Sequence, residues 1–286
     1  MVIKWSLMNL KINEIQNIFN SLIKSLEIVY LLEDIKPVTR IMVHEKDKGL
    51  FSFLNKNNLS YLKSDFKIKK QDNGAYSDKG IKIDVKSKEE GYFFVYVSKK
   101  KELAKAAKQL ESRGKHMELG LLLGYPKCCS EFFERNYEEQ SKRNNDFTLI
   151  ALRNSNGFIF PFYTNIATRH FDISLLSHFP CRFNCSCSIK IAKQRLELIK
   201  EYSKETADLI EGIMKGAVIY SEDRGVFLLR YPRLKDSKIF YQGIMATRNN
   251  KIYELLRNAE YIEILNKNSI AIGKIEINNI GIMLFF

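Results

Sequence analysis

Gly124-Tyr125-Pro126-Lys127-Cys128-Cys129 lies near the middle of the chain, between an apolar segment that ends at Leu123 and a segment with helical spacing. Proline fixes its own φ angle and lacks an N–H group, so Pro126 suits the first position of a helix. Cys128 and Cys129 are then expected in the first turn, where backbone N–H groups have no partner within the helix. Such a position favours the thiolate form of cysteine. The stretch therefore predicts a helix start that carries two polarised thiols.

A second cysteine-rich segment reads His178-Phe179-Pro180-Cys181-Arg182-Phe183-Asn184-Cys185-Ser186-Cys187. An amphipathic helical pattern follows it, and Asn184 or Ser186 is expected to cap the start of that helix. Cys181 and Cys185 are four residues apart, so they would share one face if the segment were helical. The five cysteines of the chain all lie in these two clusters, which favours a shared site.

Composition indicates a globular protein, because the 286 residues are 45% hydrophobic and 28% charged. No apolar run approaches the ~20 residues of a membrane helix, and the first residues lack the features of a signal peptide. We therefore expect a cytosolic protein without a membrane partner, in which five cysteines are not a disulfide scaffold. The net charge of +13 permits binding to RNA or another polyanion. The lysines are spread along the whole chain, however, which fits a solvated surface somewhat better.

The order of helical and strand patterns predicts an α+β fold in three parts. The first part, residues 1–98, is expected to be mixed. Its expected elements are a helix over 9–32, a strand over 38–45, a segment over 49–63 in which a helix is favoured, short strands near 66–70 and 80–86, and a strand over Tyr92–Ser98. The last of these is the clearest strand in the chain, because it is aromatic and β-branched.

The second part, residues 99–205, is expected to be helical and to carry the cysteines. The basic run at 99–101 is expected to open its first helix. Further helices are expected over 115–123, after Cys129, over 146–153, over 164–176, and after the second cysteine cluster to about 203. The third part, residues 206–286, is expected to be a small α+β domain with an antiparallel sheet. Its expected elements are helices over 206–215 and 250–258 and strands over 217–220, 226–230, 239–245, 261–265, 269–272 and 281–286.

Thiolates bind soft or borderline metals, and four sulfur ligands in a tetrahedron are typical of zinc or of an iron–sulfur cluster. The sequence therefore predicts a thiolate-bound metal centre to which His178, close by in the sequence, could add an imidazole ligand. The expected ligands come from both clusters and are Cys128, Cys129, Cys181 and Cys185. Zinc and a [4Fe–4S] cluster both stay open, because no spacing matches a zinc ribbon or a ferredoxin. Adjacent cysteines reach one ion only with strain, so one of the first pair is expected to lie beside the ion without binding it.

Two further residues, Tyr125 and Arg182, are expected to line the site and contact a cofactor. An alternative is a thiol-dependent enzyme in sulfur transfer or RNA modification, because a thiol at a helix start beside Lys127 meets the usual conditions for a lowered pKa. The candidate bases for that chemistry are His116, His170 and His178. Another alternative is a basic nucleic-acid-binding module whose cysteines are structural. The cysteines could then pack as small apolar groups, or pair between the clusters as in some hyperthermophile proteins.

The residues from Tyr92 to about 200 resemble an uncharacterised archaeal family, mostly from methanogens, that is known only as a domain of unknown function. The resemblance rests on Gly124-Tyr125-Pro126-Lys127-Cys128-Cys129 and on His178-Phe179-Pro180-Cys181-Arg182-Phe183-Asn184-Cys185. Cys187 lies outside the family pattern, so a role for this cysteine is not implied. The resemblance implies an archaeal, cytosolic origin and no known reaction. An anaerobic origin would favour an iron–sulfur cluster.

Overall fold

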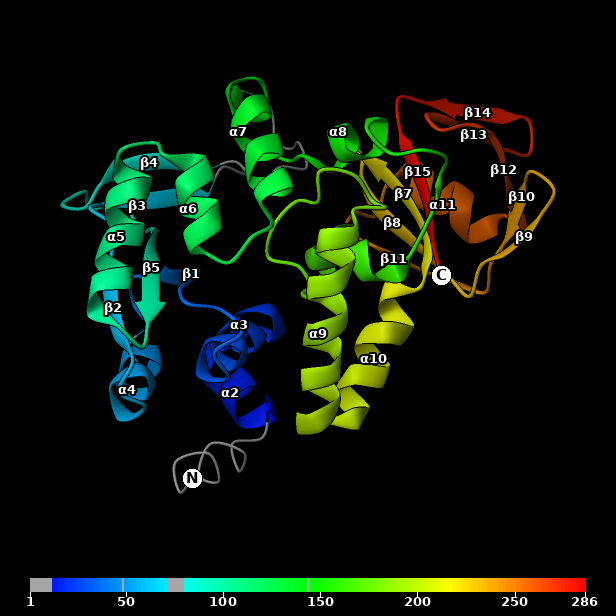
Figure 1. Ribbon diagram of the computed structural model, residues 1–286. Helices are drawn as coiled ribbons and strands as arrows, with labels where there is room; N and C mark the ends of the chain where they lie inside the picture. Colours follow the sequence, from blue (N-terminus) through cyan, green and yellow to red (C-terminus); the bar gives the residue numbers. More distant parts are fainter. Residues whose placement is uncertain (1–11, 48, 71–79, 143–144) are drawn as a thin grey trace. The chain divides into compact units, whose positions relative to one another are not determined.

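The computed structural model describes residues 12–47, 49–70, 80–142 and 145–286, and Figure 1 shows their helices and strands. The described chain is an α+β protein whose strands pair in an antiparallel manner, except for one parallel pair formed by its shortest strand. This fold class is the one that the sequence predicts. The described residues fall into two compact units, one ending at residue 142 and the other beginning at residue 145. That boundary differs from the predicted boundaries after residues 98 and 205.

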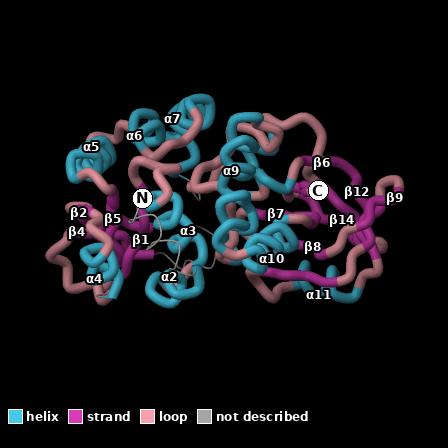
Figure 2. Tube along the Cα trace, turned by 60° about the horizontal axis from the view of Figure 1, so that its bottom comes forward, coloured by secondary structure: helices cyan, strands magenta, loops and turns pink. Residues whose placement is uncertain are grey.

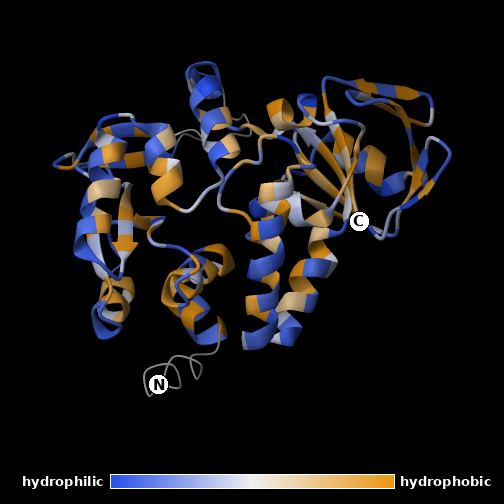
Figure 3. Cartoon of the chain, in the orientation of Figure 1, coloured by the Kyte–Doolittle hydropathy of each residue, from blue (hydrophilic) through white to orange (hydrophobic). Residues whose placement is uncertain are grey.

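The first unit is built on one antiparallel sheet whose central strand is β5 (Tyr92–Ser98). This strand pairs with β1 (Thr39–His44) on one side and with β2 (Ser60–Lys63) and β3 (Phe66–Lys70) on the other, and β3 pairs with β4 (Gly80–Asp84). Figure 3 shows β5 as mainly hydrophobic, in keeping with its sequence. The helices are α2 (Ile12–Phe19), α3 (Leu22–Leu32), α4 (Gly49–Lys56), α5 (Lys101–Ser112), α6 (His116–Leu122) and α7 (Lys127–Lys142).

Two predictions for this unit need correction. The expected helix over 9–32 is interrupted, because Asn20 adopts a left-handed φ of 51° and the hydroxyl of Ser21 caps a new helix by accepting from the Lys24 amide. Residues 9–11 of that prediction lie outside the described residues. The expected helix over 49–63 is wrong in its second half, since the helix ends at Lys56 and β2 follows. The strands predicted near 66–70, 80–86 and 92–98 are confirmed.

Helices α5 and α6 cover one face of this sheet and bring the chain to the cysteine motif. Their buried side chains Ala104, Ala107 and Leu119 pack with Tyr96 of β5. Helix α6 ends in a Schellman motif around Gly124, whose φ of 78° favours glycine. The amide of Gly124 donates to Leu121 O at 3.0 Å, and the amide of Tyr125 donates to Gly120 O at 2.9 Å. The sequence Gly-Tyr-Pro thus ends one helix immediately before the next begins.

The second unit contains two sheets, both visible in Figure 1. The first has the order β11 (Gly243–Ala246), β8 (Gly225–Arg230), β7 (Gly216–Ser221), β15 (Gly281–Phe285) and β6 (Ile159–Phe160). The second has the order β14 (Ile275–Asn278), β13 (Ser269–Ile272), β12 (Tyr261–Asn266), β10 (Lys238–Phe240) and β9 (Arg233–Lys235). The helices are α8 (Thr148–Arg153), η1 (Phe162–Thr164), η2 (Ile166–Phe171), α9 (Ser186–Tyr202), α10 (Lys204–Met214) and α11 (Lys251–Asn258).

The two sheets of this unit share one hydrophobic core with α11. Ile219 and Phe227 come from the first sheet, Ile239 and Ile262 from the second, and Leu256 from the helix, and all five are buried. Helices α9 and α10 lie side by side in this unit (Figure 2). Along β12 the buried Ile262 and Ile264 alternate with less buried residues, and those residues point to the outer face of the second sheet.

Several predictions for this unit also need correction. The expected helix over 164–176 is replaced by the short 3-10 helices η1 and η2, because side chains there hydrogen-bond to backbone groups in place of continuing a helix. Asn165 Nδ2 donates to Met214 O at 2.7 Å, and Thr168 Oγ1 donates to Asn165 O at 2.8 Å. The expected strand over 239–245 is two strands, β10 and β11, which belong to different sheets. Strands β6, β9 and β14 were not predicted.

Candidate metal centre

The first cysteine pair lies at the start of α7, as predicted. This helix begins at Lys127, and the amide of Ser130 donates to Pro126 O at 2.9 Å, which closes the first turn. Pro126 therefore stands directly before the helix. Cys128 is half-buried and Cys129 is buried, and their sulfur atoms lie 3.9 Å apart. The amide groups of this turn add positive potential beside both thiols.

Helix α6 packs closely against the residue that follows this pair. Gly120 of α6 leaves room for Ser130, because a Cβ atom at position 120 would lie 2.6 Å from Ser130 Oγ and 3.1 Å from Ser130 Cβ. Ser130 is itself buried. The backbone that carries Cys129 is therefore held in place by a close helix–helix contact.

The second cysteine segment is not helical before Cys185, so the condition under which Cys181 and Cys185 would share a helical face is not met. The chain turns between them, and the amide of Cys185 donates to Arg182 O at 3.0 Å. Cys185 is the N-cap residue of α9, in place of the predicted Asn184 or Ser186. Its carbonyl oxygen accepts from the amide of Ile189 at 3.0 Å. This second cluster thus opens a helix, as the sequence suggests, with a cysteine at the cap itself.

Phe183, a residue without a predicted role, anchors this turn. Its ring is fully buried, with ring centres 5.2 Å from Phe160 of β6 and 5.5 Å from Phe285 of β15. Its backbone is also held, because its amide donates to Ser155 Oγ at 2.8 Å and its carbonyl accepts from Thr164 Oγ1 at 2.6 Å. An apolar ring midway between two cysteines in a loop is a signal that could have identified this anchor.

The approach to the second cluster is fixed by buried polar residues. His178 Nε2 lies 3.0 Å from Ser188 Oγ, which ties the loop to the first turn of α9. Arg195, further along the same helix, is buried and donates from Nη1 to Leu175 O at 2.9 Å and to Ser177 Oγ at 3.0 Å. These side chains therefore connect α9 to the loop that leads to Cys181.

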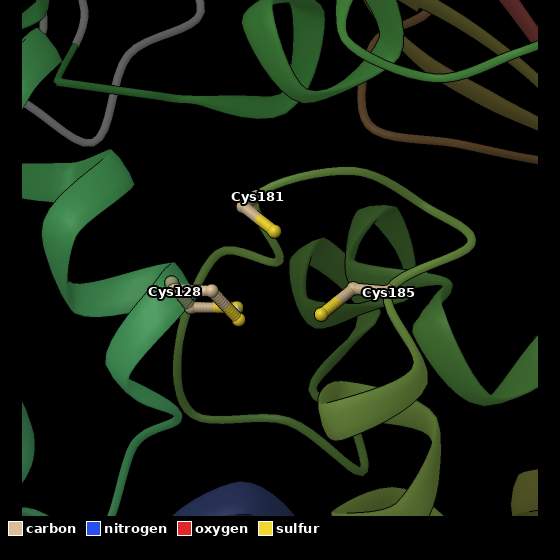
Figure 4. A group of neighbouring side chains, drawn as sticks. Cys128, Cys181 and Cys185 are labelled. Carbon is tan, nitrogen blue, oxygen red and sulfur yellow. Dashed lines mark hydrogen bonds between the residues drawn. The ribbon is translucent and has the colours of Figure 1, made fainter.

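Four of the five cysteines converge. The sulfur atoms of Cys128, Cys129, Cys181 and Cys185 all lie within 4.8 Å of one another. Figure 4 shows the side chains of three of them pointing toward a common space. None of the five cysteines, all within the described part of the chain, forms a disulfide bond. The four sulfurs form a group that could hold a metal ion, and His178 is not a member of this group.

The remaining predicted site residues have other local surroundings. The ring of Tyr125 is half-buried and packs on the core formed with α5 and α6, with Lys36 Nζ 5.4 Å from the ring centre. Arg182 is exposed, and so is Cys187, which lies in the first turn of α9. Cys187 is thus not a member of the group that the other four cysteines form.

The candidate bases differ in their electrostatic environment. His170 is buried, which lowers the pKa of its imidazole to about 4, and its Nε2 lies 3.7 Å from Asp146 Oδ2. Burial also lowers the pKa of His116, whose ring centre lies 3.8 Å from that of Tyr137. An imidazole with a pKa near 4 is a weak base at neutral pH. Burial therefore makes His170 a poor candidate for activating a thiol.

Comparison of the chain with known protein families, with curated proteins and with solved structures returned no match. Among the described residues, no helix combines the length and the apolar character that crossing a membrane requires. The geometry of the four cysteines therefore carries the argument about function.

Proposed function

We propose that Cys128, Cys129, Cys181 and Cys185 bind one metal ion through four thiolates. The observation that carries this proposal is the convergence of the four sulfur atoms within 4.8 Å of one another. Four thiolates fill a tetrahedral coordination sphere, and such closed sites are structural in known zinc proteins. The function that the geometry supports best is therefore a structural metal centre formed by two cysteine clusters that lie far apart in the sequence.

The sulfur spacing favours a single ion such as zinc over a [4Fe–4S] cluster. With zinc–sulfur bonds of about 2.3 Å, the sulfur atoms of a tetrahedral site lie about 3.8 Å apart. The sulfurs of Cys128 and Cys129 are 3.9 Å apart, close to that edge length. In a [4Fe–4S] cluster each thiolate binds a different iron atom, so the width of the cluster holds the sulfurs further apart. The 3.9 Å spacing also supports both adjacent cysteines as ligands.

The alternative of a thiol enzyme has less support. Reactive cysteines are usually partly exposed, because their sulfur has to reach a substrate. Cys129 and Cys185 are only 2% and 3% exposed, whereas Cys128 and Cys181 are half-buried. A closed tetrathiolate centre accounts for all four cysteines. Membership of the archaeal family that carries the two motifs stays a prediction, and that family supplies no reaction.

Metal analysis of anaerobically purified protein tests the proposal. We expect one zinc ion per chain, and we expect cobalt(II) in its place to give the visible spectrum of a tetrahedral thiolate site. Serine substitution of any one of Cys128, Cys129, Cys181 or Cys185 should weaken metal binding and change the cobalt spectrum. Cys187→Ser is the matched control, because it replaces an exposed cysteine beside the group and should bind metal as the wild type does.

Four results would contradict this proposal. Colourless, metal-free protein in which all five thiols are alkylated in the native state would exclude a metal centre. Several irons per chain together with acid-labile sulfide would replace the single ion with a cluster. An unchanged cobalt spectrum in both Cys128→Ser and Cys129→Ser would show that the second cluster binds metal without the first. One cysteine that reacts much faster than a free thiol would favour the thiol enzyme.

A further inference from the structure

The outer face of the sheet formed by β9, β10 and β12 carries a row of aromatic and basic side chains. Arg233 pairs across the strands with Phe240, and Phe240 pairs with Tyr261. Residues directly opposite each other in antiparallel strands point to the same face of a sheet. The neighbouring pair, Ile239 and Ile262, points to the opposite face and is buried in the core. Arg233, Phe240 and Tyr261 therefore share the face that points away from the core.

Basic side chains surround the aromatic rings on this face. Two residues further along the strands, and therefore on the same face, Lys235 pairs with Lys238, and Lys238 pairs with Glu263. Lys238 Nζ lies 4.3 Å from the ring centre of Tyr261, and the rings of Phe240 and Tyr261 have centres 5.4 Å apart. Between residues 230 and 238 the chain has four basic residues and one acidic residue. This part of the face is therefore both aromatic and positively charged.

Tyr231 lies in the connection between β8 and β9, two residues before β9 begins at Arg233. Its side chain is 65% exposed, the largest exposed fraction of any large apolar residue in the described chain. Its φ is 52°, a left-handed conformation that is uncommon for a bulky residue. The guanidinium of Arg230 lies 5.2 Å from its ring centre. Arg230 Nη1 is buried and has no hydrogen-bond partner among the described residues.

We propose that this surface, formed by Tyr231, Arg233, Lys235, Lys238, Phe240 and Tyr261, binds single-stranded nucleic acid. Proteins that bind single strands combine aromatic rings, on which bases stack, with basic groups that contact phosphates. Sheet faces with exposed aromatic side chains are a common platform for unpaired RNA. Side chains of β9, β10 and β12, together with Tyr231, supply both kinds of group. Figures 1 and 2 show β9 at the edge of the second unit, away from α9 and α10.

The aromatic side chains select a single strand over a duplex. Base stacking on a protein ring requires bases that are not stacked within a double helix. Basic residues alone, such as the exposed Lys101 and Lys105 of α5, attract any polyanion without this preference. The surface on β9 and β10 is thus distinguished from general positive charge by its dependence on rings. This inference is independent of the metal centre, because none of its residues lies near a cysteine in the sequence.

Fluorescence anisotropy with a labelled oligouridine RNA and the full chain tests this inference. Tyr231→Asn removes the ring and should be tolerated, because asparagine accepts the left-handed conformation better than tyrosine. We expect this variant to bind at least about fivefold more weakly, since stacking of one base contributes about 1–3 kcal/mol. Arg233→Gln combined with Lys235→Gln should reduce the salt dependence, because the log–log slope changes by about 0.7 for each phosphate that the protein no longer neutralises.

The controls separate this surface from other causes of binding. Leu265→Asn replaces an exposed apolar residue on β12 outside the aromatic row, and it should bind the oligouridine as the wild type does. Binding to duplex RNA should be weaker than binding to the single strand. No binding at low salt, equal binding to duplex RNA, or binding that survives Tyr231→Asn but disappears in Lys101→Gln with Lys105→Gln would each overturn the inference.

Discussion

Replacing Gly120 with alanine tests how the contact between α6 and α7 supports the first cysteine pair. Alanine in place of glycine stabilises a helix interior by about 0.8–1.0 kcal/mol. Here the new Cβ would lie 2.6 Å from Ser130 Oγ and 3.1 Å from Ser130 Cβ, so one helix has to move. Overpacking of this kind costs about 1–3 kcal/mol. We therefore expect Gly120→Ala to lower the free energy of unfolding by about 1 kcal/mol despite its better helix propensity.

A second substitution identifies the contact responsible. Ser130→Ala removes the oxygen that would be only 2.6 Å from the new Cβ and leaves the more tolerable contact at 3.1 Å. Ser130 Oγ is buried without a hydrogen-bond partner among the described residues, so its removal should cost little by itself. The double variant should therefore recover most of the stability, with a coupling of about 1 kcal/mol. Gly212→Ala in α10 is the control, because a Cβ there meets nothing within 4 Å and should be stabilising.

Hydrogen exchange followed by mass spectrometry measures these effects locally, which suits a chain with two compact units. Peptides that cover α6 and α7 report on Gly120→Ala, and peptides that cover α10 report on the control. If Gly120→Ala protects α6 and α7 as strongly as Gly212→Ala protects α10, then the close approach of Gly120 to Ser130 does not destabilise the variant, contrary to our expectation. The same result would weaken the claim that this contact fixes the position of Cys129.

Two further predictions concern buried charges. Lys36→Met removes the ammonium group that binds the buried carboxylate of Glu27, which also accepts from Thr39 Oγ1 at 2.6 Å. Breaking a buried ion pair in this way should make unfolding by denaturant easier by about 3–5 kcal/mol, with partial recovery in the double variant with Glu27→Leu. Burial lowers the pKa of His170 from 6.5 to about 4, so in that pH range the unfolded chain binds a proton that the folded chain does not. Stability should therefore fall as the pH drops from about 6.5 to about 4, by at most about 3 kcal/mol, and unfolding curves of His170→Gln should lack this dependence.

Local features of the fold were predictable where the residues of a single segment determine its structure. The strand Tyr92–Ser98 follows from its aromatic and β-branched residues, and its bounds are those of β5. The helix start after Pro126 follows from the proline and places both cysteines in the first turn. The break at Asn20 could also have been predicted, because Asn is common where a helix ends and Ser is common as the N-cap of the next helix.

Features that depend on distant residues were not predictable. The segment 239–245 has a single apolar pattern, yet its two halves pair with different partners, Lys238–Phe240 with β12 and β9, and Gly243–Ala246 with β8. The segment 164–176 has helical spacing, but Asn165 bonds to Met214, a residue far along the chain. In the candidate site, composition identified the cysteines, whereas the anchoring of the second cluster by Phe183 depends on rings from two other strands.

The charge of the proposed centre explains why both cysteine clusters open helices. Four thiolates around a divalent ion leave roughly two negative charges to be stabilised. The first pair lies in the first turn of α7 and Cys185 caps α9, so each cluster has the positive end of its own helix dipole beside it. Positive potential at a helix N-terminus favours the thiolate, which is the form of cysteine that binds metal. The same polarisation would activate a nucleophile, so exposure has to decide between the two chemistries. Because Cys129 and Cys185 are buried, the polarised sulfurs are better placed to hold an ion than to attack a substrate.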